Sequence, residues 1–291
     1  MTESIKLTRE AEIAWVVLNR PQAFNAFDGE LLEALAAQLI TLAVDPDVRA
    51  VVISGAGKAF CAGGDLKYFL GSPNGPARTI HEVAGYFHQA IIEIRRMAKP
   101  VIAAINGVAA GGGFSLALAC DFRVMAESAV LKQAYTSAGL SLDGGGSFTL
   151  PRMVGLARAL EIVAFDRPIS AQQALAWGLA TKIVPDDQVL AEAMTMAHEL
   201  AGRSLNSFGW AKRLLTDSFD SAFEAHLERE RRGLATCAAH PDGQEASASA
   251  TDIASNEKTT TVMEIFFICF PHFYIYNNTE KTISHPIEHE L

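Results

Sequence analysis

Short apolar runs recur along the first two thirds of the chain and predict buried β-strands. Residues 101–105 are rich in Ile, Val and Ala, and residues 5–7, 13–18, 48–54 and 122–126 are further expected strands with apolar side chains at most positions. Longer segments separate these runs, so we expect the strands to be joined by helices.

Helical spacing fills the segments between the predicted strands. Asp28 can cap a helix that continues to about Ala43, and residues 81–97 repeat apolar positions three and four apart. A helix recurring between short buried strands predicts an α/β fold. From Leu156 onward the pattern is mainly helical, with segments expected at residues 171–177 (capped by Ser170), 188–202, 205–217 and 221–236 and a last short strand at 183–184.

Two glycine-rich turns follow predicted strands and carry the candidate chemistry. Gly111–Gly113 lead into the apolar helix 114–119, and residues 55–66 form a second turn of small residues. Glycines at a helix entrance free backbone N–H groups to bind an oxygen atom, either of a phosphate or of a developing oxyanion. The dinucleotide and P-loop spacings are absent. Two turns of this kind favour a two-donor oxyanion site.

Several motifs resemble the crotonase family, the enoyl-CoA hydratase/isomerase superfamily, in order over about residues 5–245. They are Leu18–Pro21 with Asn25 and Ala26, Phe60–Leu66, Asn106–Gly113, Leu150–Arg152 with Val154 and Gly155, and Ala174–Pro185. The resemblance implies a spiral of repeated ββα turns, C-terminal helices that cover the acyl pocket, and assembly into trimers or hexamers. It also implies an acyl-CoA thioester substrate, with coenzyme A as part of the substrate and no separate cofactor.

This comparison suggests three parts: a core over residues 1–200, a helical subdomain over 201–250 and an atypical tail over 251–291. After Glu245 the composition changes abruptly to Ala, Ser and Thr and then to Phe, Ile, Tyr and Asn. We give this tail no functional weight.

By the same resemblance, the backbone amides of Ala62 and Gly112 are the expected oxyanion donors. The residues expected to contact the acyl-CoA are Arg20, Ala26, Lys58, Ala59, Ala62, Gly64, Asp65, Leu66, Gly112, Ser115, Tyr135 and Leu140. The apolar pocket would draw on Tyr68, Phe69, Phe87, Leu116, Leu140, Leu142 and Phe148, with residues 71–76 as a mobile wall.

The acid and base residues depart from the hydratase pattern. Hydratases of the family use two carboxylates around one water, and Ser115 and Tyr135 stand at those positions here. Asp143 lies between leucines and glycines in a loop expected to be semi-buried, an environment that suits proton transfer. Its alternative role is to cap the helix near Ser147 or to bond the glycine turn.

One carboxylate favours double-bond isomerisation with Asp143 as acid and base. A hydratase or thioesterase, and a non-catalytic acyl-CoA-binding protein, are the alternatives. Ser115, Asp143 and His198 also follow the chain order of a serine hydrolase, but no strand–Ser–helix elbow is apparent. Glu127, in an exposed-looking turn, is expected to be solvated.

Composition excludes several other classes of function. The chain has 291 residues, 49% of them hydrophobic, and a net charge of −9, which does not suggest a nucleic-acid surface. Four cysteines without CxxC spacing indicate buried thiols in a reducing compartment, with no metal site. The N-terminus lacks a signal-peptide core, and the apolar run 262–276 is shorter than the ~20 residues that cross a bilayer. We therefore expect a cytoplasmic protein with no membrane partner.

Overall fold

The structure, a computed structural model, describes residues 3–255. Contacts divide the chain into two units, Met1–Cys237 and Ala238–Leu291. The division expected at residues 200 and 250 stays a prediction. Most of the atypical tail, residues 256–291, lies outside the described residues.

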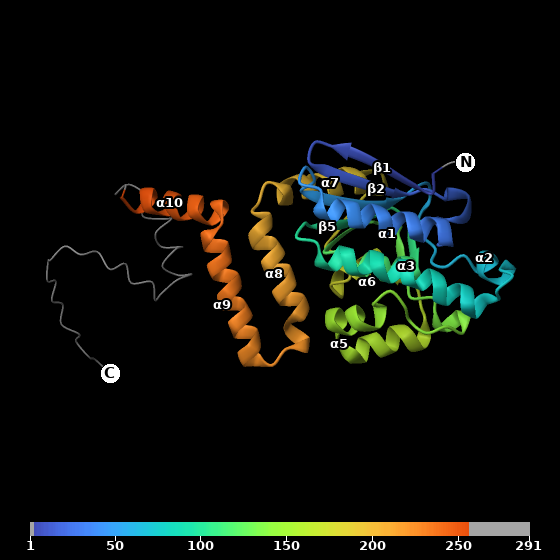
Figure 1. The fold of residues 1–291 in the computed structure, drawn as a ribbon. Helices are drawn as coiled ribbons and strands as arrows, with labels where there is room; N and C mark the ends of the chain where they lie inside the picture. Colours follow the sequence, from blue (N-terminus) through green and yellow to red (C-terminus); the bar gives the residue numbers. More distant parts are fainter. Residues whose placement is uncertain (1–2, 256–291) are drawn as a thin grey trace. The chain divides into compact units, whose positions relative to one another are not determined.

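A six-stranded sheet forms the centre of the first unit (Figure 1). Its strands, in spatial order, are β1 (Ile5–Glu10), β2 (Ile13–Leu18), β3 (Ala50–Gly55), β5 (Val101–Ile105), β7 (Phe122–Ala126) and β10 (Lys182–Val184). Only β1 and β2 pair antiparallel, while every later pair is parallel. Parallel neighbours require crossover connections, and these carry the predicted helices.

A smaller four-stranded sheet lies in the same unit, and the sequence pattern did not predict it. Its strands, in spatial order, are β4 (Ala59–Cys61), β6 (Val108–Ala110), β8 (Val130–Lys132) and β9 (Ile169–Ser170). Each of β4, β6 and β8 follows a strand of the larger sheet and precedes a helix. The chain therefore repeats the ββα turn that the resemblance implies.

Helices complete these turns. They are α1 (Gly29–Val44), α2 (Leu66–Gly71), α3 (Pro76–Arg96), α4 (Gly112–Ala119), α5 (Gly146–Phe165), α6 (Ala171–Ala176), α7 (Val189–Ala201), α8 (Leu205–Asp217), α9 (Phe223–Ala239) and α10 (Pro241–Ser255). Short 3₁₀ turns lie at Pro21–Ala23, Thr136–Ala138, Asp186–Gln188 and Ser218–Asp220. Helices α1 and α3 run side by side, and α7 contacts β3, β5 and β7 (Figure 1).

Two of the predicted helix caps are confirmed. The Asp28 carboxylate accepts a hydrogen bond from the Leu31 amide, and Ser170 forms a capping box with Gln173. Helix α3 begins at Pro76, five residues before the expected position. Proline suits the first position of a helix because the N–H it lacks would have no partner there.

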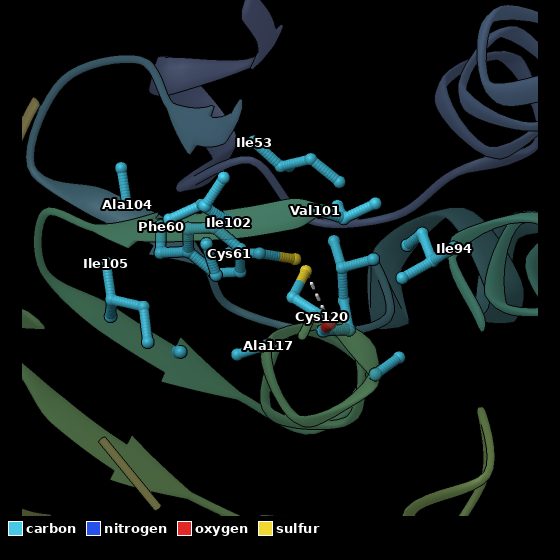
Figure 2. Packing of buried hydrophobic residues seen from close by; sticks show 14 of the residues in the cluster. Ile53, Phe60, Cys61, Ile94, Val101, Ile102, Ala104, Ile105, Ala117 and Cys120 are labelled. Carbon is cyan, nitrogen blue, oxygen red and sulfur yellow. Dashed lines mark hydrogen bonds between the residues drawn. The ribbon is translucent and has the colours of Figure 1, made fainter. Parts of the chain in front are cut away.

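The core centres on α4, all of whose residues are buried. Figure 2 shows Cys120, just after this helix, packed against Cys61 of β4 with the two sulfur atoms pointing toward one another. Burial raises the pKa of both thiols to about 12, so both stay neutral. Among the described residues, no group of three or more side chains could hold a metal ion, and no helix is long and apolar enough to span a membrane.

Candidate active site

A cavity of about 490 Å³ lies at the start of α4. It is bounded by the loop after β4, by α3, by the first residues of α4 and by the loop between β8 and α5. Of the residues predicted to contact substrate or to act in catalysis, those that line it are Ala62, Gly64, Leu66, Gly112, Tyr135, Leu140 and Asp143. Arg20, Ala26, Lys58, Ala59, Asp65 and Ser115 do not line it.

The first expected oxyanion donor is corrected by the structure. The Ala62 amide donates to the carbonyl oxygen of Phe24 at 3.0 Å, so it is not free for a ligand. Gly64 also lines the cavity, and its amide has no acceptor among residues 3–255. Its neighbours bond to Phe27, with the Phe27 amide donating to Gly63 and the Asp65 amide donating to Phe27. Because successive peptide groups of an extended chain point opposite ways, the Gly64 N–H faces away from Phe27.

Gly112, the second expected donor, also has an amide without an acceptor among residues 3–255. It is the first residue of α4, a position whose N–H has no partner within the helix. The preceding Gly111 has a φ of 52°, which turns the chain sharply into the helix. A Cβ atom on Gly63 would lie 3.1 Å from the Gly112 nitrogen, so the two glycine loops are in contact. Gly64 and Gly112, whose amides have no acceptor among residues 3–255, therefore line one cavity from adjoining loops.

Ser115 and Tyr135 form a buried hydroxyl pair at the wall of this cavity, which Tyr135 lines. Their oxygen atoms are 3.0 Å apart, and the two residues are only 1% and 8% exposed. The Tyr135 hydroxyl also lies 3.5 Å from the backbone oxygen of Asp143. Burial raises the pKa of Tyr135 well above its usual value, so the phenol stays protonated. Neither residue can act as a carboxylate does in water activation.

The loop that carries Tyr135 is fixed by two polar side chains. The Gln133 side-chain oxygen, fully buried, accepts from the amides of Tyr135 and Thr136 at 3.1 and 3.4 Å. Ala134 takes a left-handed conformation, with a φ of 52°, and its amide donates to Asp166 at 2.8 Å. These bonds hold the backbone in a conformation that alanine seldom adopts, and they set the direction of the phenol.

Asp143 is partly exposed, and its carboxylate is bonded to a histidine that the sequence analysis missed. Its Oδ1 atom lies 2.6 Å from Nε2 of His88, and the side chains of Asp143 and His88 are 36% and 54% exposed. The alternative role as a helix cap is wrong, because α5 begins after Gly145 without a side-chain cap. The glycine turn is bonded to Asp143 through the backbone, since the Gly146 amide donates to the Asp143 carbonyl oxygen at 3.0 Å. His88 stands seven residues after His81, a lining residue of the same helix. This spacing is the signal that could have found it.

Arg20, expected to contact coenzyme A, instead braces the first glycine loop. Its guanidinium donates to the Ala26 carbonyl and pairs with Asp28 and Asp65, each at 3.0 Å. Burial alone would raise the pKa of Asp65, but hydrogen bonds from the Tyr68 amide and from Arg20 bring that pKa below its usual value. Arg20 thus joins the cap of α1 to the cap of α2.

The remaining expected residues divide between the surface and the core. Lys58 is exposed, Leu66 is 52% exposed, and Ala26 and Ala59 are buried. Of the predicted apolar pocket, Phe69, Phe87, Leu140 and Leu142 line the cavity, whereas Tyr68, Leu116 and Phe148 do not. Glu127 is exposed.

The serine-hydrolase alternative finds no support in the geometry. His198 lies 3.6 Å from Glu10 of β1 and does not line the cavity. Ser115 bonds to Tyr135 instead of a histidine. The three groups are therefore not assembled into a triad.

Comparison with known proteins decides the family. A model of the family described as enoyl-CoA hydratase/isomerase matches residues 8–251. The chain belongs to this family. It is 34% identical over 232 residues to the 1,2-epoxyphenylacetyl-CoA isomerase of Escherichia coli, a match that covers 79% of this chain and 88% of that one. It is 33% identical over 233 residues to 4-chlorobenzoyl coenzyme A dehalogenase-1 of an Arthrobacter species, covering 79% and 83% of the two chains.

Solved structures of the family share the fold. A crystal structure of an enoyl-CoA hydratase from Polaromonas sp. JS666 matches with a TM-score of 0.79 and 37% identity, covering 85% of this chain and 96% of that one. The α/β crotonase fold predicted from the sequence is therefore confirmed. The names of these relatives include an isomerase, a hydratase and a dehalogenase, so membership of the family establishes an acyl-CoA enzyme without fixing its reaction.

Proposed function

We propose that this enzyme isomerises the double bond of an enoyl-CoA. The Gly64 and Gly112 amides would bind the thioester oxygen, and Asp143 would move the proton. The observation that carries the proposal is the hydroxyl pair of Ser115 and Tyr135, bonded at 3.0 Å where a hydratase would have its two carboxylates. Coenzyme A enters as part of the substrate, and no separate cofactor is needed.

Each step of isomerisation has a group to carry it. Asp143 removes the α- or γ-proton of the enoyl thioester, and the electron pair moves onto the thioester oxygen to form an enolate. Two fixed N–H donors stabilise this charge, and loss of one such donor costs about 10²–10³ in rate in other enzymes. Asp143 then returns the same proton at another carbon, so one carboxylate is enough. The His88 imidazole, 2.6 Å away, holds the carboxylate in place.

The buried hydroxyl pair also disfavours hydration. Tyr135 and Ser115 satisfy one another, and a Cβ atom on Gly146 would lie 2.8 Å from the Ser115 oxygen. This close packing leaves little room for a water between the two side chains. Water addition would then have to rely on Asp143 alone.

Replacing Asp143 with asparagine tests the proposal. Asp143→Asn keeps the side-chain volume and removes the base, so kcat should fall about 10²–10⁴-fold with KM little changed. The assay follows a panel of enoyl-CoA substrates by absorbance and mass. Isomerisation conserves mass, hydration adds one water, and a thioesterase releases free coenzyme A.

A matched substitution separates catalysis from folding. Asp186→Asn removes an exposed carboxylate far along the chain, bonded to Ser128, and should leave kcat unchanged. Solvent deuterium exchange into the substrate should fall in parallel with kcat in Asp143→Asn. Near-full activity of Asp143→Asn would overturn the isomerase proposal, and binding without turnover of any substrate would favour a non-catalytic acyl-CoA-binding protein.

The His88–Asp143 pair favours a second candidate, hydrolytic dehalogenation of an aryl-CoA. A carboxylate can displace a halide, and an adjacent imidazole can activate the water that releases the product. Overall, one water replaces chloride by hydroxyl and yields chloride and a proton. The dehalogenase relative has 4-chlorobenzoyl coenzyme A in its name. Chloride release from that compound would favour this candidate over isomerisation.

We also propose that the protein assembles as a homotrimer or hexamer, as the family resemblance implies. Large apolar side chains are exposed on two stretches of the first unit. They are Leu156, Leu160 and Phe165 on α5 and Leu215, Phe219, Phe223, Leu227 and Leu234 from α8 through α9. Exposed apolar surface of this extent is typical of protein–protein contacts.

A further inference from the structure

A second cavity, of about 250 Å³, lies at the opposite end of α4 from the candidate active site. It is formed where α4 ends at Cys120 and Asp121, between α3, α5 and α8, and three of its lining residues are arginines: Arg95, Arg123 and Arg152. It shares no lining residue with the candidate active site. The two cavities are therefore separate.

Two of the charged groups at this cavity are already satisfied. Asp121 accepts from Nζ of Lys212 at 2.6 Å and from the Val101 amide at 2.9 Å. The Arg123 guanidinium donates to the carbonyl oxygens of Leu179 and Cys120, at 2.8 and 2.6 Å. These groups contribute to the electrostatic potential of the cavity, but they are engaged in structural bonds.

Arg95 is the group with unmet hydrogen-bonding capacity. A guanidinium has five N–H donors, yet in the described part of the chain Arg95 makes one long hydrogen bond, of 3.4 Å to the Thr216 hydroxyl. Burial lowers the pKa of Arg95, the charges of Asp121 and Asp217 oppose this effect, and the neighbouring charges of Arg96 and Arg152 add to it. An anion beside Arg95 would relieve both the lost solvation and the repulsion.

Arg152 points a second, rigidly held guanidinium at the same cavity. It stacks 3.4 Å from the ring centre of Phe148 and 4.8 Å from that of Phe219. Its ion pair with Asp220 is long, at 3.9 Å, and that carboxylate is 65% exposed. Stacking fixes the plane of the guanidinium, and Nη1 donates to the Phe148 carbonyl oxygen at 2.9 Å. Among residues 3–255 the Nε and Nη2 groups of Arg152 make no hydrogen bond, so these two neighbouring donors are left for a ligand.

The charge around the cavity is positive, although the net charge of the whole chain is negative. The cations in and beside it are Arg95, Arg96, Arg123, Arg152 and Lys212, and the carboxylates are Asp121, Asp217 and Asp220. Five cations against three carboxylates give a local excess of two positive charges, in a chain of net charge −9. Such an excess in a partly buried site favours an anionic occupant.

We propose that this cavity binds a small oxyanion, a phosphate or a carboxylate, through Arg95 and Arg152. Planar guanidinium groups match the geometry of both anions and can bind them through two parallel hydrogen bonds. A cavity of about 250 Å³ suits a small anion and is too small for a nucleotide such as coenzyme A. The occupant is an oxyanion from solution, and a side-chain carboxylate from a second copy of the chain is the alternative that the experiment distinguishes.

Calorimetric titration with inorganic phosphate tests this site on the full chain. The titration is run with saturating coenzyme A present, at constant ionic strength, so that the acyl-CoA site cannot contribute. We expect saturable binding, and a rise of Tm with phosphate concentration. Arg95→Met keeps the aliphatic stem and removes the donors, so it should weaken phosphate binding about tenfold or more.

Arg78→Met is the matched control, because Arg78 lies on the same helix, is paired with Glu82 at 2.8 Å, and does not line the cavity. It should bind phosphate within about twofold of the parent chain, since exposed charges are screened by salt. Circular dichroism and the Tm without phosphate establish that Arg95→Met is folded. Equal phosphate affinity in Arg95→Met and the parent overturns the proposal. Absence of saturable phosphate binding by the parent chain also overturns the proposal. If Arg95→Met then loses assembly as well, the cavity is assigned to a carboxylate of a second copy.

Discussion

Cys61 and Cys120 couple the stability of the core to pH. Both thiols are fully buried and have a pKa of about 12, against 9.0 for a thiol in water. The folded state therefore favours the neutral thiol, and this contribution to stability is complete below pH 9. It is lost as pH rises from 9 towards 12, because the unfolded chain ionises first.

Urea unfolding between pH 7 and pH 10 measures this loss. Each pH unit above 9 should lower the free energy of unfolding by up to about 1.4 kcal/mol per thiol. Cys61→Ala and Cys120→Ala should each reduce this slope by one thiol's share. Below pH 8 the slope should be the same in all three proteins, which provides the internal control. An unchanged slope above pH 9 in both variants would show that the thiols ionise freely in the folded chain.

Single residues explain how far the candidate site can be predicted from the sequence. Asp143 is found because it is the only carboxylate in its loop, a fact visible in the sequence. The sequence favours the Ala62 amide, but that amide is bonded to the Phe24 carbonyl, far back in the chain, whereas pairing with Phe27 leaves the Gly64 amide without an acceptor among residues 3–255. His88 is missed because its partner is 55 residues away, and only the packing of α3 against the loop brings the two together. Pairings of this kind are tertiary, and no local pattern encodes them.

At the scale of elements, close packing of α4 against β4 makes one glycine indispensable. A Cβ atom on Gly113 would lie 2.2 Å from the carbonyl oxygen of Cys61, a backbone atom that cannot move aside. Gly113→Ala should therefore lower the free energy of unfolding by about 3 kcal/mol or more, as overpacking does.

The same substitution in an open helix should have the opposite sign. Gly85 lies inside α3, and among the described residues no atom outside the local helix backbone lies within 4 Å of the position that an alanine methyl group would occupy there. Gly85→Ala should therefore raise the free energy of unfolding by about 0.5–1 kcal/mol. Chemical denaturation of both variants provides the comparison. Equal effects of the two substitutions would contradict the close packing of α4 against β4.

Element length determines which parts of the fold the sequence can predict. Helices α1, α7 and α8 lie within a few residues of their expected positions, because their apolar residues repeat over three or more turns. Strands β4, β6 and β8 have three residues each, too few to display a period. Their pairing with one another is set by the stacking of the ββα turns, so these strands are visible only in the folded chain.

At the scale of the whole molecule, the proposed assembly can be tested at α5. Leu156, Leu160 and Phe165 are 66%, 59% and 62% exposed, although a buried position would stabilise each of them by roughly 1.5–3 kcal/mol. If α5 lies in a contact between copies, Leu160→Glu buries a charge there and should shift the protein to smaller species at micromolar concentration. Val44→Glu is the matched control, since Val44 is 81% exposed at the end of α1 and should leave assembly unchanged. Analytical ultracentrifugation of the parent and both variants measures the masses. A monomeric parent chain would contradict the proposed trimer, and an unshifted Leu160→Glu would place the contact elsewhere than α5.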